Sequence, residues 1–145
     1  MTIGGKKEMK EDCIFCKIAN GIIPSATIYE NSDFKVILDV SPASKGHTLI
    51  LPKEHFDNIF DMDADTAGKL FSLAAAVARA LKQATNCDGM NIVQNNGEIA
   101  GQTVFHFHMH LIPRYEGDQV TVSWTPGSAT QEELNEIASA VKKVL

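Results

Sequence analysis

The stretch Val104-Phe105-His106-Phe107-His108-Met109-His110-Leu111-Ile112 places a histidine at every second position among large apolar residues. This period-two pattern predicts a β-strand over residues 104–112, because successive side chains of a strand point to opposite faces. The three histidines are then expected on one face and the apolar residues on the other. The apolar face indicates a core, which leaves the histidine face for chemistry.

The histidine face admits three interpretations. The rings could fill a half-exposed surface, or two of them at i and i+2 could grip a zinc ion, although a hydrolytic metal site would also need carboxylates that this stretch lacks. The third interpretation is nucleophilic catalysis by His108, with neighbours that orient it and transfer protons. We favour the third, because imidazoles about 6 to 7 Å apart disfavour each other's charging and stay neutral near pH 7.

The rest of the chain predicts an α+β fold. Apolar runs predict strands over residues 26–29, 34–39, 47–51 and 91–94, the first at a sheet edge and the third in its centre. Residues 13–19 predict a short helix, residues 70–81 carry the apolar spacing of a long one, and a capping box at Thr130 and Glu133 begins a C-terminal helix. Strands in runs, interrupted by one long helix, predict an antiparallel five-stranded sheet.

Length, charge and hydropathy exclude several classes of protein. The 145 residues, 44% of them hydrophobic, suit a single domain over residues 12–145 after a disordered leader over residues 1–11. A net charge of −5 disfavours extended binding to nucleic acid or to an anionic membrane, whereas a small anionic ligand remains possible. No signal peptide or membrane-spanning run is found, so we expect a cytoplasmic protein.

The three cysteines cannot all pair within the chain. Cys13 and Cys16 form a Cys-x-x-Cys pair, and Cys87 stands alone. The pattern suits a reducing compartment and a metal or thiol role better than a disulfide framework, although one such pair is a weak signal. Cys87 is interpreted as a small core residue or a surface thiol without function.

Around its three alternating histidines the sequence resembles the histidine triad (HIT) family, and within it the bacterial members of the Hint branch. The signature His-x-His-x-His followed by two apolar residues is met by residues 106–112. The resemblance extends from Asp12 onward, through Cys-Ile-Phe-Cys-Lys-Ile, Leu-Asp-Val-Ser-Pro, Gly-His-Thr-Leu-Ile-Leu-Pro-Lys-Glu-His and Ala-Gly-Gln-Thr-Val. It implies an α+β domain whose sheet continues across a homodimer, and a nucleotidyl-histidine intermediate that water hydrolyses.

The resemblance also implies roles for individual residues. His108 matches the nucleophile, His110 the residue that contacts the phosphate and assists the leaving group, and His47 a further active-site histidine. Asp39 matches the carboxylate that binds the ribose hydroxyls. The residues that match a phosphate-binding and leaving-group loop are Asn95, Gly101, Gln102 and Thr103. The residues that could line a pocket for the base, and could equally be core, are Ile14, Phe15, Ile18 and Ile37.

Some members of the family bind zinc through the cysteine pair and two histidines. That set transfers to Cys13, Cys16, His55 and His106, a Cys2His2 combination suited to tetrahedral zinc. Such a zinc would be structural, pinning the N-terminal segment to the sheet, and catalysis would need no cofactor. Without zinc, His106 would orient the site.

The resemblance implies hydrolysis of purine nucleoside phosphoramidates or related nucleotidyl conjugates. Arg114, together with Ala-Gly-Gln-Thr-Val, is also similar to the Fhit branch, so dinucleoside polyphosphates are an alternative substrate. A nucleotide-binding or protein-binding module with vestigial activity is another. Trp124 is expected to be exposed, where it could cover the site of a dimer partner or simply pack locally.

Overall fold

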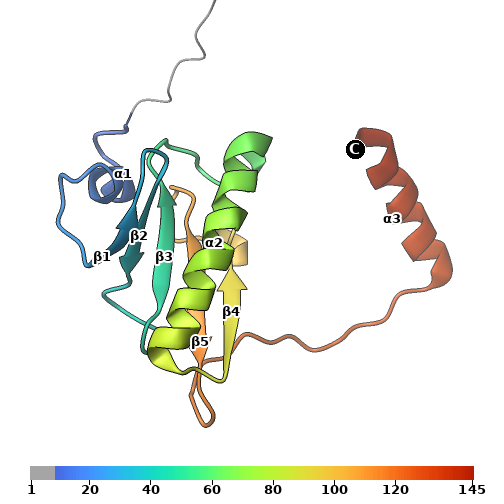
Figure 1. Ribbon diagram of the computed structural model, residues 1–145. Helices are drawn as coiled ribbons and strands as arrows, with labels where there is room; N and C mark the ends of the chain where they lie inside the picture. Colours follow the sequence, from blue (N-terminus) through green and yellow to red (C-terminus); the bar gives the residue numbers. More distant parts are fainter. Residues whose placement is uncertain (1–8) are drawn as a thin grey trace, which may run out of the picture.

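A computed structural model describes residues 9–145 and shows one antiparallel five-stranded sheet (Figure 1). The strand order is β1-β2-β3-β5-β4, and each neighbouring pair is antiparallel. The strands are β1 (Thr27–Glu30), β2 (Phe34–Leu38), β3 (Thr48–Pro52), β4 (Gly89–Val93) and β5 (Met109–Arg114). The predicted α+β class, the edge position of β1 and the central position of β3 are confirmed.

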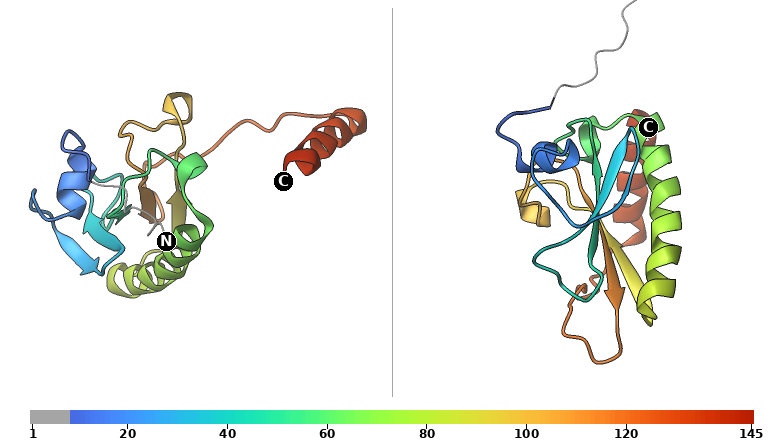
Figure 2. Two further views of the ribbon diagram at one scale, coloured as in Figure 1. Left: turned by 90° about the horizontal axis from the view of Figure 1, so that it is seen from above. Right: turned by 60° about the vertical axis from the view of Figure 1, so that its left-hand side comes forward.

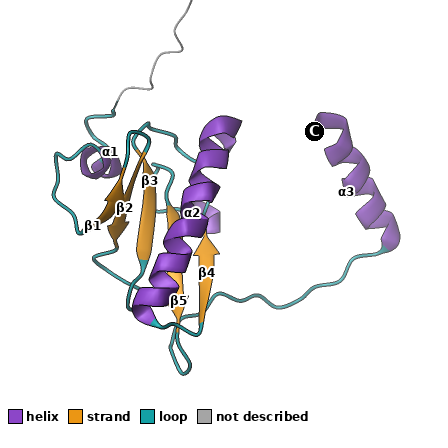
Figure 3. Ribbon diagram, viewed as in Figure 1, coloured by secondary structure: helices purple, strands orange, loops and turns teal. Residues whose placement is uncertain are grey.

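The helices begin and end at residues with clear capping chemistry. α1 (Ile14–Ala19) begins at Cys13, whose Sγ accepts the Cys16 N–H, and α2 (Ala64–Thr85) begins at Asp63, whose carboxylate accepts the Thr66 N–H. Figure 3 shows the helices against the strands. Two short 3-10 helices, η1 (Ile59–Asp61) and η2 (Glu98–Ala100), lie in the loops after β3 and β4.

The two faces of the sheet carry different layers. On one face α2 buries Leu70, Ala74, Val77 and Leu81 in the main core cluster. On the other face α1 packs over a smaller cluster of Ala19, Ile37, Leu49 and Leu51. Successive side chains point to opposite faces of a strand. The histidines stand between apolar residues that face α2, so they lie on the α1 face.

The predicted strand over residues 104–112 is wrong at its start. β5 begins at Met109 and runs to Arg114, past the proline expected to close it, so only His110 of the three histidines lies in a strand. The Phe107 N–H donates to the Phe56 carbonyl in a loop, and the pairing of β3 with β5 begins at Met109. The alternation still holds where it matters, since Phe107, Met109 and Leu111 share the main core cluster.

The apolar face expected for this stretch also begins later than predicted. Phe105 is 49% exposed and lies outside the core. The neighbouring side chain of Phe107 is 1% exposed. The sequence pattern marks the correct side of the chain, but it cannot tell where the backbone leaves the sheet.

Residues 1–8 of the predicted disordered leader lie outside the described residues. Residues 9–11 are described, and Lys10 accepts the Cys13 N–H through its carbonyl. The ammonium group of Lys10 lies 3.6 Å from the Asp57 carboxylate. The last residues of the predicted leader therefore touch the folded domain.

The C-terminal helix stands apart from the sheet (Figure 1). α3 (Gln131–Val144) begins at the predicted capping box of Thr130 and Glu133 and buries none of its residues. A segment over residues 116–130 without helix or strand leads to it. Within residues 9–145 no helix is long and apolar enough to cross a membrane.

Candidate active site and metal centre

His108 is held in one tautomer by the backbone. Its Nδ1–H donates to the carbonyl oxygen of His106 at 2.8 Å, because a carbonyl can only accept. The lone pair of the neutral ring therefore lies on Nε2, which has no hydrogen-bond partner among residues 9–145. Since every fully buried side-chain nitrogen and oxygen there has a partner, Nε2 reaches the accessible surface. Burial lowers the pKa of His108, which keeps the ring neutral and nucleophilic.

His110 is fixed in the opposite sense by a short relay. The Ala43 N–H donates to Nδ1 of His47 at 2.9 Å, so the neutral His47 ring carries its proton on Nε2. That Nε2–H donates to Nδ1 of His110 at 2.9 Å, which leaves the proton of His110 on its own Nε2. Burial lowers the pKa of His47, and lowers the pKa of His110 to about 4, so both rings are neutral at pH 7.

The rings of His108 and His110 therefore lie together with complementary atoms. The ring centroids of His108 and His110 are 4.9 Å apart. One ring offers a lone pair and the other offers an N–H. The predicted catalytic residues His47, His108 and His110 are brought into one cluster.

Asp39 lies at the edge of the same cluster. Its Oδ2 is 3.7 Å from Nε2 of His47, and its Oδ1 accepts the Ser41 N–H at 2.8 Å. The carboxylate side chain is 20% exposed, so it remains open to a ligand. A carboxylate in this position is an acceptor for hydroxyl groups beside the histidines.

The apolar candidates divide between ligand surface and core. Phe15 meets the ring of His108 edge to face, with centroids 4.9 Å apart, and Ile14 is 51% exposed. Ile37 is buried in the cluster under α1, and Ile18 packs against it. Phe15 and Ile14 can therefore contact a ligand, whereas Ile37 belongs to the core.

One buried side chain, that of Gln102, holds together the polar loop that precedes the histidines. Gln102 is 2% exposed, and its amide donates to the carbonyls of Asp57 and Val104 while accepting the Gly97 N–H. The side chain is fully used within the loop. Its observed contacts organise the loop instead of facing the histidines.

The other loop residues are more open. Gly101 has φ +98, a left-handed conformation that favours glycine, and an added Cβ would lie 3.4 Å from the Asn95 side chain. Thr103 is exposed and lines a hollow of about 540 Å³ together with Cys13, Ile14 and Asp57 among others. Thr103 therefore lies near the two cysteines and His55.

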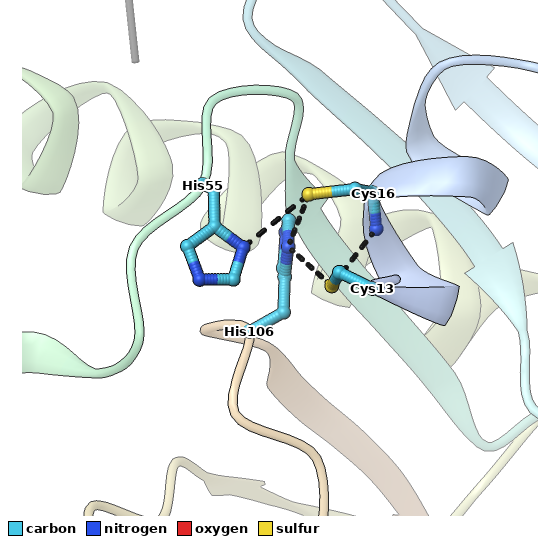
Figure 4. Close-up of side chains that lie close together, drawn as sticks. All are labelled: Cys13, Cys16, His55 and His106. Carbon is cyan, nitrogen blue, oxygen red and sulfur yellow. Dashed lines mark hydrogen bonds between the residues drawn. The ribbon is translucent and has the colours of Figure 1, made fainter. Parts of the chain in front are cut away.

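A second cluster joins the two cysteines of the N-terminal segment to two histidines (Figure 4). The His106 Nε2–H donates to the Pro52 carbonyl at 2.9 Å, and the His55 Nε2–H donates to the Asp57 carboxylate at 2.7 Å. Both rings therefore turn the lone pair of Nδ1 toward the cysteines. Cys13, Cys16, His55 and His106 come together as predicted.

The spacing of these four ligand atoms suits a tetrahedral zinc ion. The Sγ of Cys16 lies 3.3 Å from Nδ1 of His55 and 3.4 Å from Nδ1 of His106, and the Sγ of Cys13 lies 3.5 Å from Nδ1 of His106. Zinc bonds to sulfur and nitrogen at tetrahedral angles imply separations of about 3.5 Å. Burial raises the pKa of the Cys16 thiol to about 11, and a bound cation would reverse that shift by stabilising the thiolate.

Sequence reasoning missed Asp57, which orients His55. The hydrogen bond from the imidazole lowers the pKa of the Asp57 carboxyl, and carboxylate–histidine pairs of this kind support metal sites. The spacing His-x-Asp over residues 55–57 was the available signal. The backbone groups that orient the other rings, at Ala43 and Pro52, leave no such signal in the sequence.

Three further residues that the sequence singled out belong to neither cluster. Arg114 donates to the Asp118 carboxylate, the Val120 carbonyl and Asn91, so its guanidinium is used by the turn that follows β5. Trp124 is exposed, as predicted. Cys87 is buried, which decides between its two interpretations in favour of the core.

Comparisons with known proteins agree with this fold. The fold and the clustered histidines are those of an antiparallel α+β domain with a histidine site. The family model of the HIT domain matches residues 20–117 of this chain. The solved structure of a HIT family member from Bacillus subtilis is 43% identical, with a TM-score of 0.88 over 93% of this chain and 98% of that chain. The chain belongs to the HIT family.

Two other relatives have more specific names. A Zn-bound histidine triad family protein from Mycobacterium smegmatis is 35% identical, with a TM-score of 0.72 over 92% of this chain and 95% of that chain. The Adenylylsulfatase HINT3 of Arabidopsis thaliana is 39% identical over 110 residues, which are 76% of this chain and 56% of the relative.

Proposed function

We propose that this protein is a nucleotide hydrolase or nucleotidyl transferase that attacks the α-phosphorus of purine nucleoside phosphoramidates or related nucleotidyl conjugates. One observation carries the proposal: the His106 carbonyl fixes the proton of His108 on Nδ1 and exposes the lone pair of Nε2. A neutral imidazole held in this way is a nucleophile that needs no further activation. The adenylylsulfatase among the relatives supports an adenylyl substrate.

The proposed reaction has two displacements. Nε2 of His108 forms a bond to phosphorus while the bond from phosphorus to the leaving group breaks, and the leaving amine or oxygen, held by a hydrogen bond from the Nε2–H of His110, takes its proton from solvent. The relay from His47 keeps the proton of His110 on Nε2. Water then attacks phosphorus while the bond from phosphorus to Nε2 of His108 breaks, one proton of the water passes to solvent, and the nucleotide leaves with both rings neutral.

Substrate binding follows from the surroundings of the two rings. Asp39 would accept hydrogen bonds from the ribose hydroxyls, and Phe15 and Ile14 would contact the base. Asn95 and Thr103 would donate hydrogen bonds to the phosphate and the leaving group. The hydrogen bonds of Gln102 hold their loop together, and Gly101 supplies the left-handed backbone conformation that the loop needs. Because the histidines are neutral, they supply no positive charge to the phosphoryl oxygens. The uncharged donors of the loop would therefore stabilise these oxygens.

We infer that the cysteine–histidine cluster holds a structural zinc. The lone pairs of two imidazoles and two thiols converge at separations that suit tetrahedral coordination, and a relative with this fold is Zn-bound. The ion would join the N-terminal segment to the two histidine-bearing loops. Catalysis itself would not pass through it.

The decisive experiment is to trap the intermediate. A rapid quench with an adenosine phosphoramidate should leave a labelled nucleotide on the wild-type chain, mapped to His108 by mass spectrometry, and His108→Ala should lose both label and turnover. Cys87→Ser, which changes a residue outside both clusters, should keep both. Full turnover by His108→Ala would disprove the proposal.

Substrate profiling separates the alternatives. The ratio of kcat/KM for a phosphoramidate to that for a diadenosine polyphosphate should exceed one if the first class is correct. A higher value for the polyphosphate would assign the chain to dinucleoside polyphosphate hydrolysis. Nucleotide binding without turnover of either substrate would indicate a binding module.

We also propose a homodimer in which the sheet continues across β4. β4 is an edge strand, and Ile92 is 45% exposed on it. Open strand edges offer unpaired backbone groups that another copy can occupy. In analytical ultracentrifugation, Ile92→Lys should shift the dimer to monomer, and the matched change Thr27→Lys on β1, at the other edge, should not. An unchanged dimer in Ile92→Lys would place the interface elsewhere.

A further inference from the structure

α3 presents an apolar stripe to solvent. Leu134, Ile137 and Val141 lie along one side of the helix and are 54%, 65% and 50% exposed, and Leu145 continues the stripe at the end of the chain. An isolated helix of 14 residues is marginal in water, so most of its stability has to come from packing of this stripe. The stripe therefore needs a surface that covers it.

A groove of matching character lies on the α2 side of the sheet. Its volume is about 750 Å³, and it is lined by Ile28 and Tyr29 of β1, Leu38 of β2 and, among others, Leu73, Ala80 and Thr85 of α2. The α2 side of the groove extends over about 20 Å, and α3 spans about 21 Å, at 1.5 Å per residue. The groove, with Lys45 as the one charged residue of its lining, has the length and apolar surface that the stripe requires.

Arg114 fixes the direction in which the chain leaves the sheet. Its guanidinium donates to both oxygens of Asp118 at 2.8 and 2.7 Å, to the Val120 carbonyl at 2.7 Å and to Asn91 of β4 at 2.7 Å. The chain is thereby tied to β4, whereas the groove lies beside β1 at the opposite edge. Figure 2 shows the following segment and α3 running away from the sheet.

We propose that α3 is an exchanged arm, whose apolar stripe packs into the groove between α2 and strands β1 and β2 of a second copy of this chain. The occupant is a second copy because the exit past β4 carries each arm away from its own groove. A reciprocal exchange buries both stripes and both grooves in one symmetric association. The inference adds to the dimer proposed above and can fail alone, since two copies could pair at β4 while both arms stay free.

Cross-linking between two different chains tests the exchange. One full-length chain carries Ala80→Cys in the groove, and the other carries Ile137→Cys in the stripe and a distinguishable tag. After mixing and mild oxidation, we expect a disulfide between the two chains, and none when Ser139→Cys on the opposite side of α3 replaces Ile137→Cys. No link between the chains, or a link within one chain that carries both Ala80→Cys and Ile137→Cys, would overturn the proposal.

Self-association provides a second readout. Ala80→Arg in the groove and Ile137→Asp in the stripe should each raise the dissociation constant of the dimer at least tenfold. The matched variants Ala75→Arg, also exposed on α2, and Ser139→Asp should leave it unchanged. A dimer that is equally tight in Ala80→Arg and Ile137→Asp would mean that the stripe contributes nothing to association.

Discussion

At the scale of single residues, the site depends on which nitrogen of each histidine carries the proton. The rings of His55 and His106 turn a lone pair of Nδ1 to the cysteines, and His108 offers the lone pair of Nε2. His110 offers an Nε2–H because the relay through His47 occupies its other nitrogen. Five chemically identical side chains thus acquire three roles from the groups beside them.

The relay predicts an effect of His47 that depends on the leaving group. In His47→Ala, Nδ1 of His110 loses its donor, the proton can move to the wrong nitrogen, and kcat should fall on the order of 10² or more for an amine leaving group. The loss should be much smaller for a leaving group that departs without a proton, such as sulfate. Equal losses for both would contradict a role for the Nε2–H of His110 as the hydrogen-bond donor to the leaving group. The double variant with His110→Ala should lose little more than either single variant, because both act on the same proton.

Burial of these rings predicts acid destabilisation. The pKa of His110 falls from 6.5 to about 4 in the folded protein, mainly through burial, so the folded state binds fewer protons than the unfolded state between these values. The free energy of unfolding should therefore be constant above about pH 7 as far as His110 is concerned, and fall as the pH drops from 6.5 toward 4. Urea titrations at several pH values would measure this, and His110→Gln should flatten the slope. An unchanged slope in that variant would assign the effect to other groups.

At the scale of elements, α2 and the α1 segment divide the work between the two faces of the sheet. α2 buries its apolar stripe against the core residues of the central strands. The short α1 places Phe15 against His108, and the two cysteines of its first turn lie against His55 and His106. Side chains that alternate along β5 point to both faces, so this strand connects the two layers. A rigid core on one side thereby holds the chemical side in position.

This division predicts unequal costs for two neighbouring residues of α2. Leu70 is 2% exposed in the core and Phe71 is 59% exposed. Leu70→Ala should lower the free energy of unfolding by about 2–5 kcal/mol, because it removes buried methyl groups and leaves a cavity. Phe71→Ala should change it by about 0.5 kcal/mol or less, as expected of a surface position. Equal losses in denaturant titrations would mean that Phe71 is covered in solution, for example by a second copy.

At the scale of the whole molecule, the cysteine–histidine cluster joins segments that are far apart in the chain. Cys13 and Cys16 come from the N-terminal segment, His55 from the loop after β3, and His106 from the segment before β5. His106 also supplies the carbonyl that orients His108. A metal ion at the cluster would therefore stabilise the fold around His108.

Metal removal should accordingly affect stability more than chemistry. Zinc at about 1,000 times its dissociation constant should stabilise the fold by about 4 kcal/mol and raise Tm, and a chelator should reverse the gain. Cys13→Ser should abolish the zinc-dependent rise in Tm, whereas Cys87→Ser should keep it. In protein that remains folded after chelation, His108 should still be labelled by the nucleotide, and complete loss of labelling would indicate a catalytic metal.

The sequence by itself determined the fold class, the edge position of β1, the central position of β3 and the capping box of α3. It could do so because the period-two and period-3.6 patterns of apolar residues depend only on local backbone geometry. The resemblance to the HIT family, carried by the His-x-His-x-His signature and the motifs around it, implied the role of His108 and the four residues of the cysteine–histidine cluster.

Only the tertiary structure decided where the strand begins, which protons the histidines carry and that α3 lies apart from the sheet. Those outcomes depend on contacts between distant residues, such as Phe107 with the Phe56 carbonyl and His106 with Pro52. A local pattern cannot encode the position of a backbone group about 50 residues away, and that position sets the direction of each hydrogen bond. The sequence therefore determines which residue types form the site, and the fold determines the direction of their hydrogen bonds.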